Sequence, residues 1–277
     1  MKSGKNMKMN DGIRRLQGIS VAGCQRQVTR LIQARSENSL RWLYAPWACL
    51  VFVPFFFLWT ALVCTTIVLV SRFGKSYLLD RLPVVWARPI CWANLTSVEI
   101  VGKDRIVSGQ SYVVISNHQS QFDILAVNGY LMMPIRWVMK ASLRKVPFLG
   151  SASDAMGHVF IDRSQNKKAI ASLKEAWSRV SNGVSVHFFA EGTRSPDGRL
   201  RPFKKGAFKT ALDLDLPILP ISITGSFRIL PKGSVRPLPG HIQIRVHEPV
   251  DVGKYGAQNL DQLMADTHQI IAGGLVE

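Results

Sequence analysis

Residues 112–123, YVVISNHQSQFD, join a short apolar strand to a polar turn and then to a helix. The run from Tyr112 to Ser116 is mostly apolar and β-branched, which is typical of a strand buried on both faces of a sheet. Polar side chains follow it at once, and an apolar stretch of helical character begins after Asp123. Side chains that follow such a strand lie at the carboxyl edge of the sheet, where α/β proteins bind their ligands. The stretch therefore predicts an α/β fold and a site at this edge.

The chain beyond residue 95 repeats the alternation of strands and helices. The predicted strands are 98–101, 112–116, 158–161, 184–189, 218–223 and 242–246, and the predicted helices are 166–180, 206–214 and 257–271. Helical spacing is clearest in 166–180, where apolar side chains recur every three or four residues and Gly183 follows the end. This order predicts a mixed, mostly parallel sheet with helices on both faces.

His118 and Asp123 lie five residues apart across the turn between the strand and the helix. A carboxylate held against one imidazole nitrogen fixes the tautomer and leaves the other nitrogen to take a proton. The sequence has no GxSxG motif, so the nucleophile would be a hydroxyl of the substrate, and Ser120 is interpreted as a helix cap. A His/Asp pair at this spacing is also common among unrelated surface and capping residues.

The predicted strand 184–189 runs into a second polar loop that contains Glu191-Gly192-Thr193-Arg194. Glycine lets the backbone approach a ligand closely, and the planar fork of arginine suits phosphate oxygens. Five more Lys or Arg residues follow between 199 and 209. Taken alone, the tetrapeptide fits a phosphate-binding loop and a solvated basic turn equally well.

Residues 42–71 contain no charged side chain. A spanning helix needs roughly 20 apolar residues, so this run predicts a membrane segment. It would cross the bilayer once, or enter and leave one leaflet as a bent pair of shorter helices, with Pro46 and Pro54 allowing the bend. Both flanks carry excess positive charge, which favours a re-entrant segment held from the cytoplasmic side. We expect a basic N-terminal segment (1–41), a membrane-anchoring segment (42–94) and an α/β domain (95–277).

The whole chain is strongly basic. Its 277 residues include 35 Lys or Arg and 18 Asp or Glu, a formal net charge of +17, and 47% of them are hydrophobic. That apolar content excludes a disordered protein, and the charge predicts an anionic partner: nucleic acid, acidic lipid or a phosphorylated small substrate. The basic residues are not interleaved with aromatic residues as in nucleic-acid stacking platforms, and the six histidines have no metal-ligand spacing.

Taken together and in this order, the motifs resemble those of the 1-acylglycerol-3-phosphate acyltransferase family of glycerolipid acyltransferases. The likeness covers about residues 80 to 250, and Ala190 departs from it because the family usually has proline there. That change removes no functional group. The matching blocks are NHQSQFD (117–123), KASLRKVPFLG (140–150), GHVFIDR (157–163), FAEGTRS (189–195) and LPILPI (216–221).

The resemblance implies the glycerolipid acyltransferase fold, an N-terminal membrane anchor and an acyl transfer reaction. The acyl chain would pass from acyl-CoA or acyl-carrier protein to the sn-2 hydroxyl of 1-acyl-glycerol-3-phosphate, giving phosphatidic acid for phospholipid biosynthesis. His118 would deprotonate the acceptor hydroxyl and then protonate the leaving thiolate, while Asp123 holds its ring. Backbone N–H groups near His118 would stabilise the oxyanion.

The resemblance also implies how the acceptor is bound. Arg194 would bind the acceptor phosphate, with Lys140 as a second cation. Gly192 and Thr193 would shape this pocket, and Glu191 would orient the loop or the glycerol hydroxyl.

The partners implied are lysophosphatidic acid, the acyl donor and anionic membrane lipid, without nucleic acid, metal or cofactor. The protein would lie at the inner (cytoplasmic) membrane with its catalytic domain on the cytoplasmic face. An anchored site avoids drawing acyl chains into water, which costs about 0.8 kcal/mol per CH₂. Two alternatives remain: an acyltransferase for another lyso-lipid acceptor, either a lysophospholipid or a lyso-aminolipid, and a basic membrane-associated nucleic-acid-binding protein.

Overall fold

In the computed structural model, the described residues form a sheet of seven strands. They are β1 (Thr96–Val101), β2 (Val113–Ser116), β3 (Ile135–Lys140), β4 (Val159–Ile161), β5 (Ser185–Phe189), β6 (Ile218–Thr224) and β7 (Gly240–Val246). Their order is β1-β7-β6-β2-β5-β3-β4, so the strand that precedes His118 is central. β2 is parallel to both β5 and β6, while β6 and β7 are antiparallel. The predicted mixed, mostly parallel sheet is confirmed.

The structure describes residues 39, 42–74, 76–161 and 183–275. The predicted helix 166–180 and nearly all of the basic segment 1–41 lie outside the described residues. Residues 47–277 form one compact unit.

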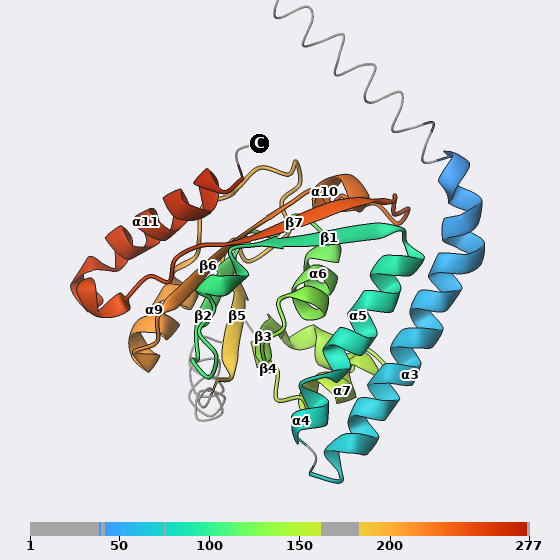
Figure 1. The fold of residues 1–277 in the computed structure, drawn as a ribbon, viewed down its shortest axis with the longest axis horizontal. Helices are drawn as coiled ribbons and strands as arrows, with labels where there is room; N and C mark the ends of the chain where they lie inside the picture. Colours follow the sequence, from blue (N-terminus) through green and yellow to red (C-terminus); the bar gives the residue numbers. More distant parts are fainter. Residues whose placement is uncertain (1–38, 40–41, 75, 162–182, 276–277) are drawn as a thin grey trace, which may run out of the picture. The chain divides into compact units, whose positions relative to one another are not determined.

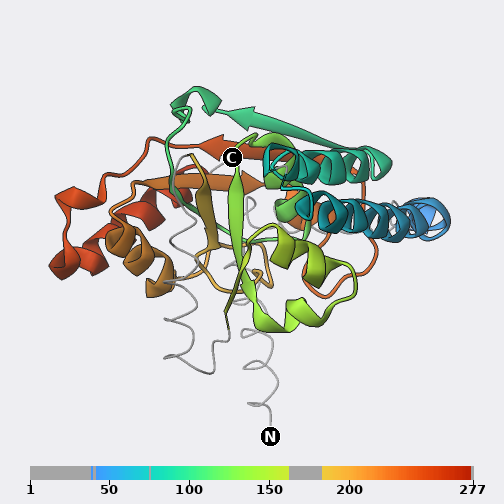
Figure 2. The ribbon, with the colours of Figure 1, turned by 90° about the horizontal axis from the view of Figure 1, so that it is seen from below.

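Helices cover both faces of the sheet. α5 (Leu82–Ala93) and α6 (Phe122–Tyr130) pack on one face, and α9 (Lys205–Leu214) and α11 (Leu260–Gly273) pack on the other (Figures 1 and 2). Because side chains of a strand alternate between faces, Val114 packs in the core on the α5 and α6 side, while Val113 and Ile115 pack on the α9 and α11 side. All three are fully buried.

Strand β3 was not predicted, because its sequence IRWVMK does not have a clear strand pattern. Ile135 and Trp137 are buried, whereas Arg136 lies between them and forms an ion pair with Asp80 (Nη1 to Oδ1, 3.0 Å). Arg136 therefore interrupts the apolar run by which the other strands were predicted.

The apolar run forms a single helix, Trp42–Ser71, which is long and apolar enough to cross a membrane by length and composition. It passes through a π-helical turn (Ala48–Phe52) directly into α3 (Val53–Ser71). The turn changes the hydrogen-bond register just before Pro54, where the missing proline N–H would otherwise interrupt an α-helix. Of the two arrangements expected for this run, the structure has the single helix and not the bent pair of shorter helices.

α3 is instead paired with α5, which follows α4 (Ser76–Leu79) and runs back alongside it (Figure 1). Trp47 Nε1 donates to the Ala93 carbonyl (3.0 Å), and Trp59 Nε1 donates to the Val85 carbonyl (3.1 Å). Residue numbers that rise on one helix while they fall on the other show an antiparallel helical hairpin.

One side of α3 carries large exposed apolar side chains. Phe57, Leu58 and Leu62 are 66%, 73% and 57% exposed, and on α5 Trp92 is 62% exposed. The opposite side of α3 packs against α5 and α7 (Leu149–Ala155). An apolar surface of this kind indicates association with a membrane.

Candidate active site

The carboxyl ends of β2, β5 and β3 lie at one edge of the sheet. Ser116 is opposite Phe189 in the β2–β5 register, and β3 is the parallel neighbour of β5 on its other side. The structure therefore brings the loop that contains His118 next to the loop that contains Glu191 and Arg194. Lys140, the last residue of β3, lies at the same edge.

His118 and Asp123 form the predicted pair, with 2.8 Å between Nδ1 and Oδ2. The Asp123 side chain is fully buried and that of His118 is 12% exposed. Asp123 Oδ2 also accepts hydrogen bonds from the N–H groups of Gln119 (2.7 Å) and Ser120 (2.8 Å). An acceptor-only carboxylate on Nδ1 fixes the Nδ1–H tautomer, so Nε2 is the nitrogen that can take a proton.

The backbone N–H groups of residues 118–120 are engaged within the protein. The His118 N–H donates to Glu191 Oε1 (2.8 Å), and the next two donate to Asp123. The expectation that these groups stabilise the oxyanion is therefore wrong for residues 118–120. The side chains of Glu191 and Asp123 accept these hydrogen bonds, which the sequence motif did not indicate.

Ser120 lies next to the N-cap residue of the following helix, Gln121, rather than at the predicted cap position itself. Its Oγ accepts a hydrogen bond from the N–H of Phe122 (3.2 Å), the first residue of α6, and donates one to the Leu230 carbonyl (2.8 Å). The hydroxyl hydrogen points at a backbone carbonyl rather than at His118, so the arrangement does not activate Ser120 as a nucleophile.

Glu191 joins the two loops. Its side chain is buried, and Oε1 accepts the His118 N–H, while the Ser195 N–H donates to the His118 carbonyl (2.8 Å). Burial raises the pKa of Glu191 to about 7, although the hydrogen bond from His118 and the nearby Arg201 oppose the rise. Of the two roles expected for Glu191, this hydrogen bond fits orientation of the loop.

An aromatic contact that the sequence did not predict holds the His118 ring. This ring stacks on Phe189 with the centroids 3.6 Å apart and an interplanar angle of 10°. His187, two residues earlier on β5, packs edge-on against Phe189 (centroids 4.9 Å apart), and burial together with His118 lowers its pKa to about 3. The available signal was the alternation along β5, which places residues 187 and 189 on the same face.

The predicted phosphate-binding residues lie around the exposed end of the second loop. Gly192 has φ +74°, a left-handed conformation that favours glycine. Thr193 is exposed and accepts a hydrogen bond from Lys232 Nζ (3.4 Å). Among the described residues, no hydrogen bond or ion pair engages the side chain of Arg194 or of Lys140. Both cations therefore remain available to an anionic ligand, although the structure shows no contact between them.

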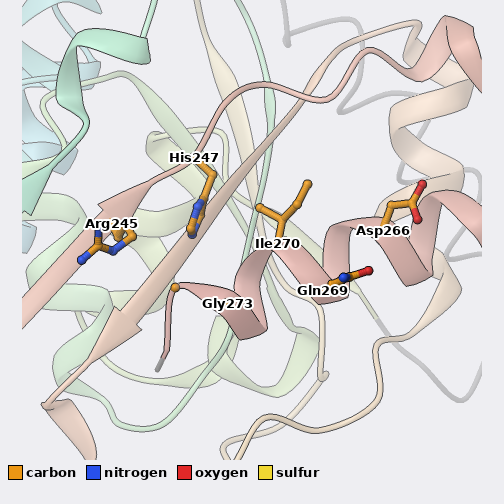
Figure 3. A pocket seen from close by; sticks show the side chains of 7 residues that line it. Arg245, His247, Asp266, Gln269, Ile270 and Gly273 are labelled. Carbon is orange, nitrogen blue, oxygen red and sulfur yellow. The ribbon is translucent and has the colours of Figure 1, made fainter. Parts of the chain in front are cut away.

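A cavity of about 740 Å³ lies away from these residues, between β7 and α11 (Figure 3). Arg245 and His247 line it from β7 and the residue after it, and Ile270 faces them from α11 (Figure 3). His247 Nε2 lies 2.7 Å from Ser222 Oγ, which itself donates to the Ile271 carbonyl (2.8 Å). The serine hydrogen is thus already used, so His247 donates its Nε2 hydrogen to Ser222.

Comparison with known proteins agrees with the site. Residues 97–224 match the family model described as Acyltransferase. A 1-acyl-sn-glycerol-3-phosphate acyltransferase of Chlamydomonas reinhardtii is 30% identical over 235 residues, which cover 84% of this chain and 68% of that protein. The human 1-acyl-sn-glycerol-3-phosphate acyltransferase alpha is 38% identical over 157 residues, covering 55% of this chain and 54% of that protein.

A chloroplastic relative and a solved structure extend the comparison. The 1-acyl-sn-glycerol-3-phosphate acyltransferase BAT2 of Brassica napus is 36% identical over 57% of this chain and 48% of its own length. The chain thus spans about half the length of the Brassica and human relatives. The crystal structure of the 1-acyl-sn-glycerophosphate acyltransferase of Thermotoga maritima matches with a TM-score of 0.66 and 25% identity, covering 88% of this chain and 95% of that one. The predicted fold is confirmed.

Proposed function

The chain belongs to the 1-acyl-sn-glycerol-3-phosphate acyltransferase family, and from that premise we propose that it acylates the sn-2 hydroxyl of 1-acyl-glycerol-3-phosphate. The donor is a thioester, acyl-CoA or acyl-carrier protein, and the product is phosphatidic acid for phospholipid biosynthesis. The observation that carries the proposal is the His118–Asp123 pair at the sheet edge where Arg194 and Lys140 also lie.

The geometry of His118 supports direct transfer. Nε2 takes the proton of the acceptor hydroxyl as its oxygen attacks the thioester carbonyl carbon and forms the new C–O bond. The tetrahedral intermediate collapses with cleavage of the C–S bond, and the imidazolium returns the proton to the leaving thiolate. Asp123 stabilises the imidazolium through Nδ1–H. The stacking on Phe189 limits rotation of the ring between the two proton transfers.

The acceptor phosphate binds on the β5 and β3 side of His118. The planar guanidinium of Arg194 accommodates two phosphate oxygens, and Lys140 adds a second charge. Gly192 and Thr193 form the wall between them. β3 leads into α7, which packs against α3, so this half of the site adjoins the apolar hairpin. An acceptor that keeps its acyl chain in the membrane approaches from that side.

The membrane segment holds the enzyme at the cytoplasmic face of the inner membrane. Positive charge on both sides of the helix disfavours translocation of either flank, and the nine Lys or Arg in residues 1–41 are attracted to anionic headgroups. The three parts are then the basic segment 1–41, the anchoring segment 42–94 and the acyltransferase domain 95–277. Labelling of cysteines introduced in both flanks from the same side of sealed vesicles tests this topology, and labelling from opposite sides contradicts it.

The activity test uses purified protein in anionic vesicles with lysophosphatidic acid and each donor type. We expect phosphatidic acid to form, and Arg194→Ala to raise KM for lysophosphatidic acid about tenfold while KM for the donor stays unchanged. Lys209→Ala, an exposed cation on α9, is the matched control. Equal changes in both KM values contradict the phosphate role, and equal use of lysophospholipids that lack a terminal phosphate favours another lyso-lipid acceptor.

A further inference from the structure

A second cavity, of about 490 Å³, lies beside the residue that follows His118. Four segments build it: the turn after β2, the loop after β5, the end of β6 with α10 (Ser226–Ile229), and the end of α11. Their lining residues include Gln119, Gly198, Arg199, Thr224, Phe227 and Arg228. None of these residues has a role in the proposed chemistry.

Internal contacts fix the walls of this cavity. Gln119 Nε2 donates to the Gly198 carbonyl (2.8 Å). Gly198 has φ +80°, and a Cβ there would come within 3.1 Å of the Phe227 ring, so glycine is what lets the loop lie this close. Asp197, also in the wall, accepts hydrogen bonds from Ser195 Oγ (3.0 Å) and the Arg199 N–H (3.1 Å). The cavity is therefore a built feature of the sheet edge.

The cavity lies on the opposite side of His118 from the cations proposed for the acceptor. Along the edge the strands follow the order β6, β2, β5, β3. Thr224 ends β6 and lines the cavity, His118 follows β2, and Lys140 ends β3. The loop after β5 crosses from one side to the other, since Ser195 bonds to the His118 carbonyl. A catalytic base between two binding regions is what a two-substrate transfer requires.

The proposed acceptor site and the cavity also adjoin different sides of the sheet. The acceptor side leads to α7 and the apolar α3, whereas the cavity is lined by Ala272 and Leu275 at the end of α11, which packs on the other face. A water-soluble ligand can therefore enter the cavity without passing the membrane hairpin. This placement favours the acyl donor over the lipid acceptor as its occupant.

The lining matches one part of that donor. Arg199 and Arg228 supply positive charge, offset in part by Asp197, which pairs with Arg199 (Oδ2 to Nε, 3.9 Å), while Phe227 and Leu200 supply apolar surface. Acyl-CoA and acyl-carrier protein share the 4′-phosphopantetheine arm, which joins a phosphate to a dimethyl-substituted carbon and two amides before the thioester. Resting on the proposed acyl transfer, we infer that this cavity binds the phosphopantetheine arm of the donor, with Arg199 and Arg228 contributing the charge that binds its phosphate.

The test compares two donors that differ only in this phosphate, acyl-4′-phosphopantetheine and acyl-pantetheine. We expect Arg199→Ala and Arg228→Ala each to raise KM about tenfold for the first donor and to leave KM for the second donor and for lysophosphatidic acid unchanged. Lys209→Ala, which removes the same charge from α9, is expected to change none of the three. The Arg199 side chain is 87% exposed, so its substitution keeps the test valid even if Arg228→Ala fails to fold.

Acyl-CoA and acyl-carrier protein form the other arms of the test. We expect each arginine substitution to raise KM for both donors, because both carry the phosphopantetheine arm. A rise for acyl-CoA alone would assign the arginines to the nucleotide, and a rise for acyl-carrier protein alone would assign them to the carrier surface. Either outcome overturns the inference, as does an equal rise with acyl-pantetheine.

A binding measurement separates this inference from the proposed function. Calorimetry measures binding of CoA to the His118→Ala protein, with and without Arg199→Ala added. About tenfold weaker binding supports the cavity even if the wild-type enzyme does not acylate lysophosphatidic acid, which would refute the proposed function alone. Unchanged CoA binding by the double variant, together with normal acylation of lysophosphatidic acid, would refute the cavity alone.

Discussion

His118 and His247 both lie beside cavities, but their hydrogen bonds differ. His118 binds a buried carboxylate through Nδ1, which leaves Nε2 to take a proton. His247 gives its Nε2 hydrogen to Ser222, whose own hydrogen goes to the Ile271 carbonyl. The cavity beside His247 is the larger, about 740 Å³ against about 490 Å³. The partner of each imidazole nitrogen, rather than the size of the nearby cavity, therefore distinguishes the proposed base from the other histidine.

The electrostatic environments of the His118 and His247 rings differ as well. Burial lowers the pKa of His247, and Arg245 and Arg105 lower it further. No carboxylate in the described part of the chain forms an ion pair with His247. A protonated His247 would thus be destabilised, whereas Asp123 stabilises a protonated His118. Four substitutions test this difference.

His118→Ala should have the largest effect. Removal of the general base is expected to lower kcat by roughly 10²- to 10⁴-fold, because Nε2 of His118 is the atom proposed to accept the hydroxyl proton. Steady-state kinetics measures this, and thermal unfolding of the variant checks that the fold is intact. Substantial activity in a folded variant would remove His118 from its role.

Asp123→Asn should lower kcat less than the loss of His118 does, yet by about tenfold or more. An amide can donate to Nδ1 and so favour the wrong tautomer, and it no longer stabilises the imidazolium. Since the buried carboxylate also accepts two backbone N–H groups, urea unfolding should show a loss of about 1–3 kcal/mol. Full activity with this loss of stability would make Asp123 a structural residue only.

Glu191→Gln should change the pH dependence of stability more than catalysis. The pKa of Glu191 is raised from 4.5 to about 7, so between these values the folded state keeps a proton that the unfolded chain has lost. The wild-type Tm should therefore fall, relative to that of the variant, as pH rises from about 4.5 to about 7, and the difference should then stay constant.

The effect of Glu191→Gln on kcat should stay below about tenfold, because the glutamine oxygen can still accept the His118 N–H. Thermal unfolding across pH and steady-state kinetics measure the two effects. Parallel wild-type and variant Tm curves across the whole range would show that Glu191 keeps an ordinary pKa.

His247→Ala should have the smallest effect. We expect kcat and both KM values to stay within about twofold, and stability to fall by about 1 kcal/mol through loss of the hydrogen bond to Ser222. The same kinetic assay and urea unfolding measure both quantities. A loss of activity as large as that of His118→Ala would contradict the distinction between the two histidines.

The sequence predicts the catalytic pair because its determinants are local. Strand, turn and helix all lie within residues 112–123, so the motif that predicts the strand end also places His118 near Asp123. Six of the seven strands were predicted within a few residues, because most of their residues are apolar. β3 was missed because the partner of Arg136 is Asp80, which lies 56 residues away.

The supporting contacts of the site could not be predicted from the sequence in the same way. Glu191 binds the His118 N–H from 73 residues away, so the engagement of that N–H group is set by the pairing of β2 with β5. The stack of Phe189 on His118 has the same origin. The cavity beside Gln119 depends on four segments that meet only in the folded chain.

In the proposed reaction, the acceptor hydroxyl attacks the thioester directly, with His118 as its base. Intact-mass analysis of the wild-type enzyme, quenched after incubation with acyl donor alone, tests it. We expect an unmodified protein mass, with the acyl group transferred only when lysophosphatidic acid is added. An acyl group bound to Ser120 or another side chain, formed and released as fast as the enzyme turns over, would contradict direct attack.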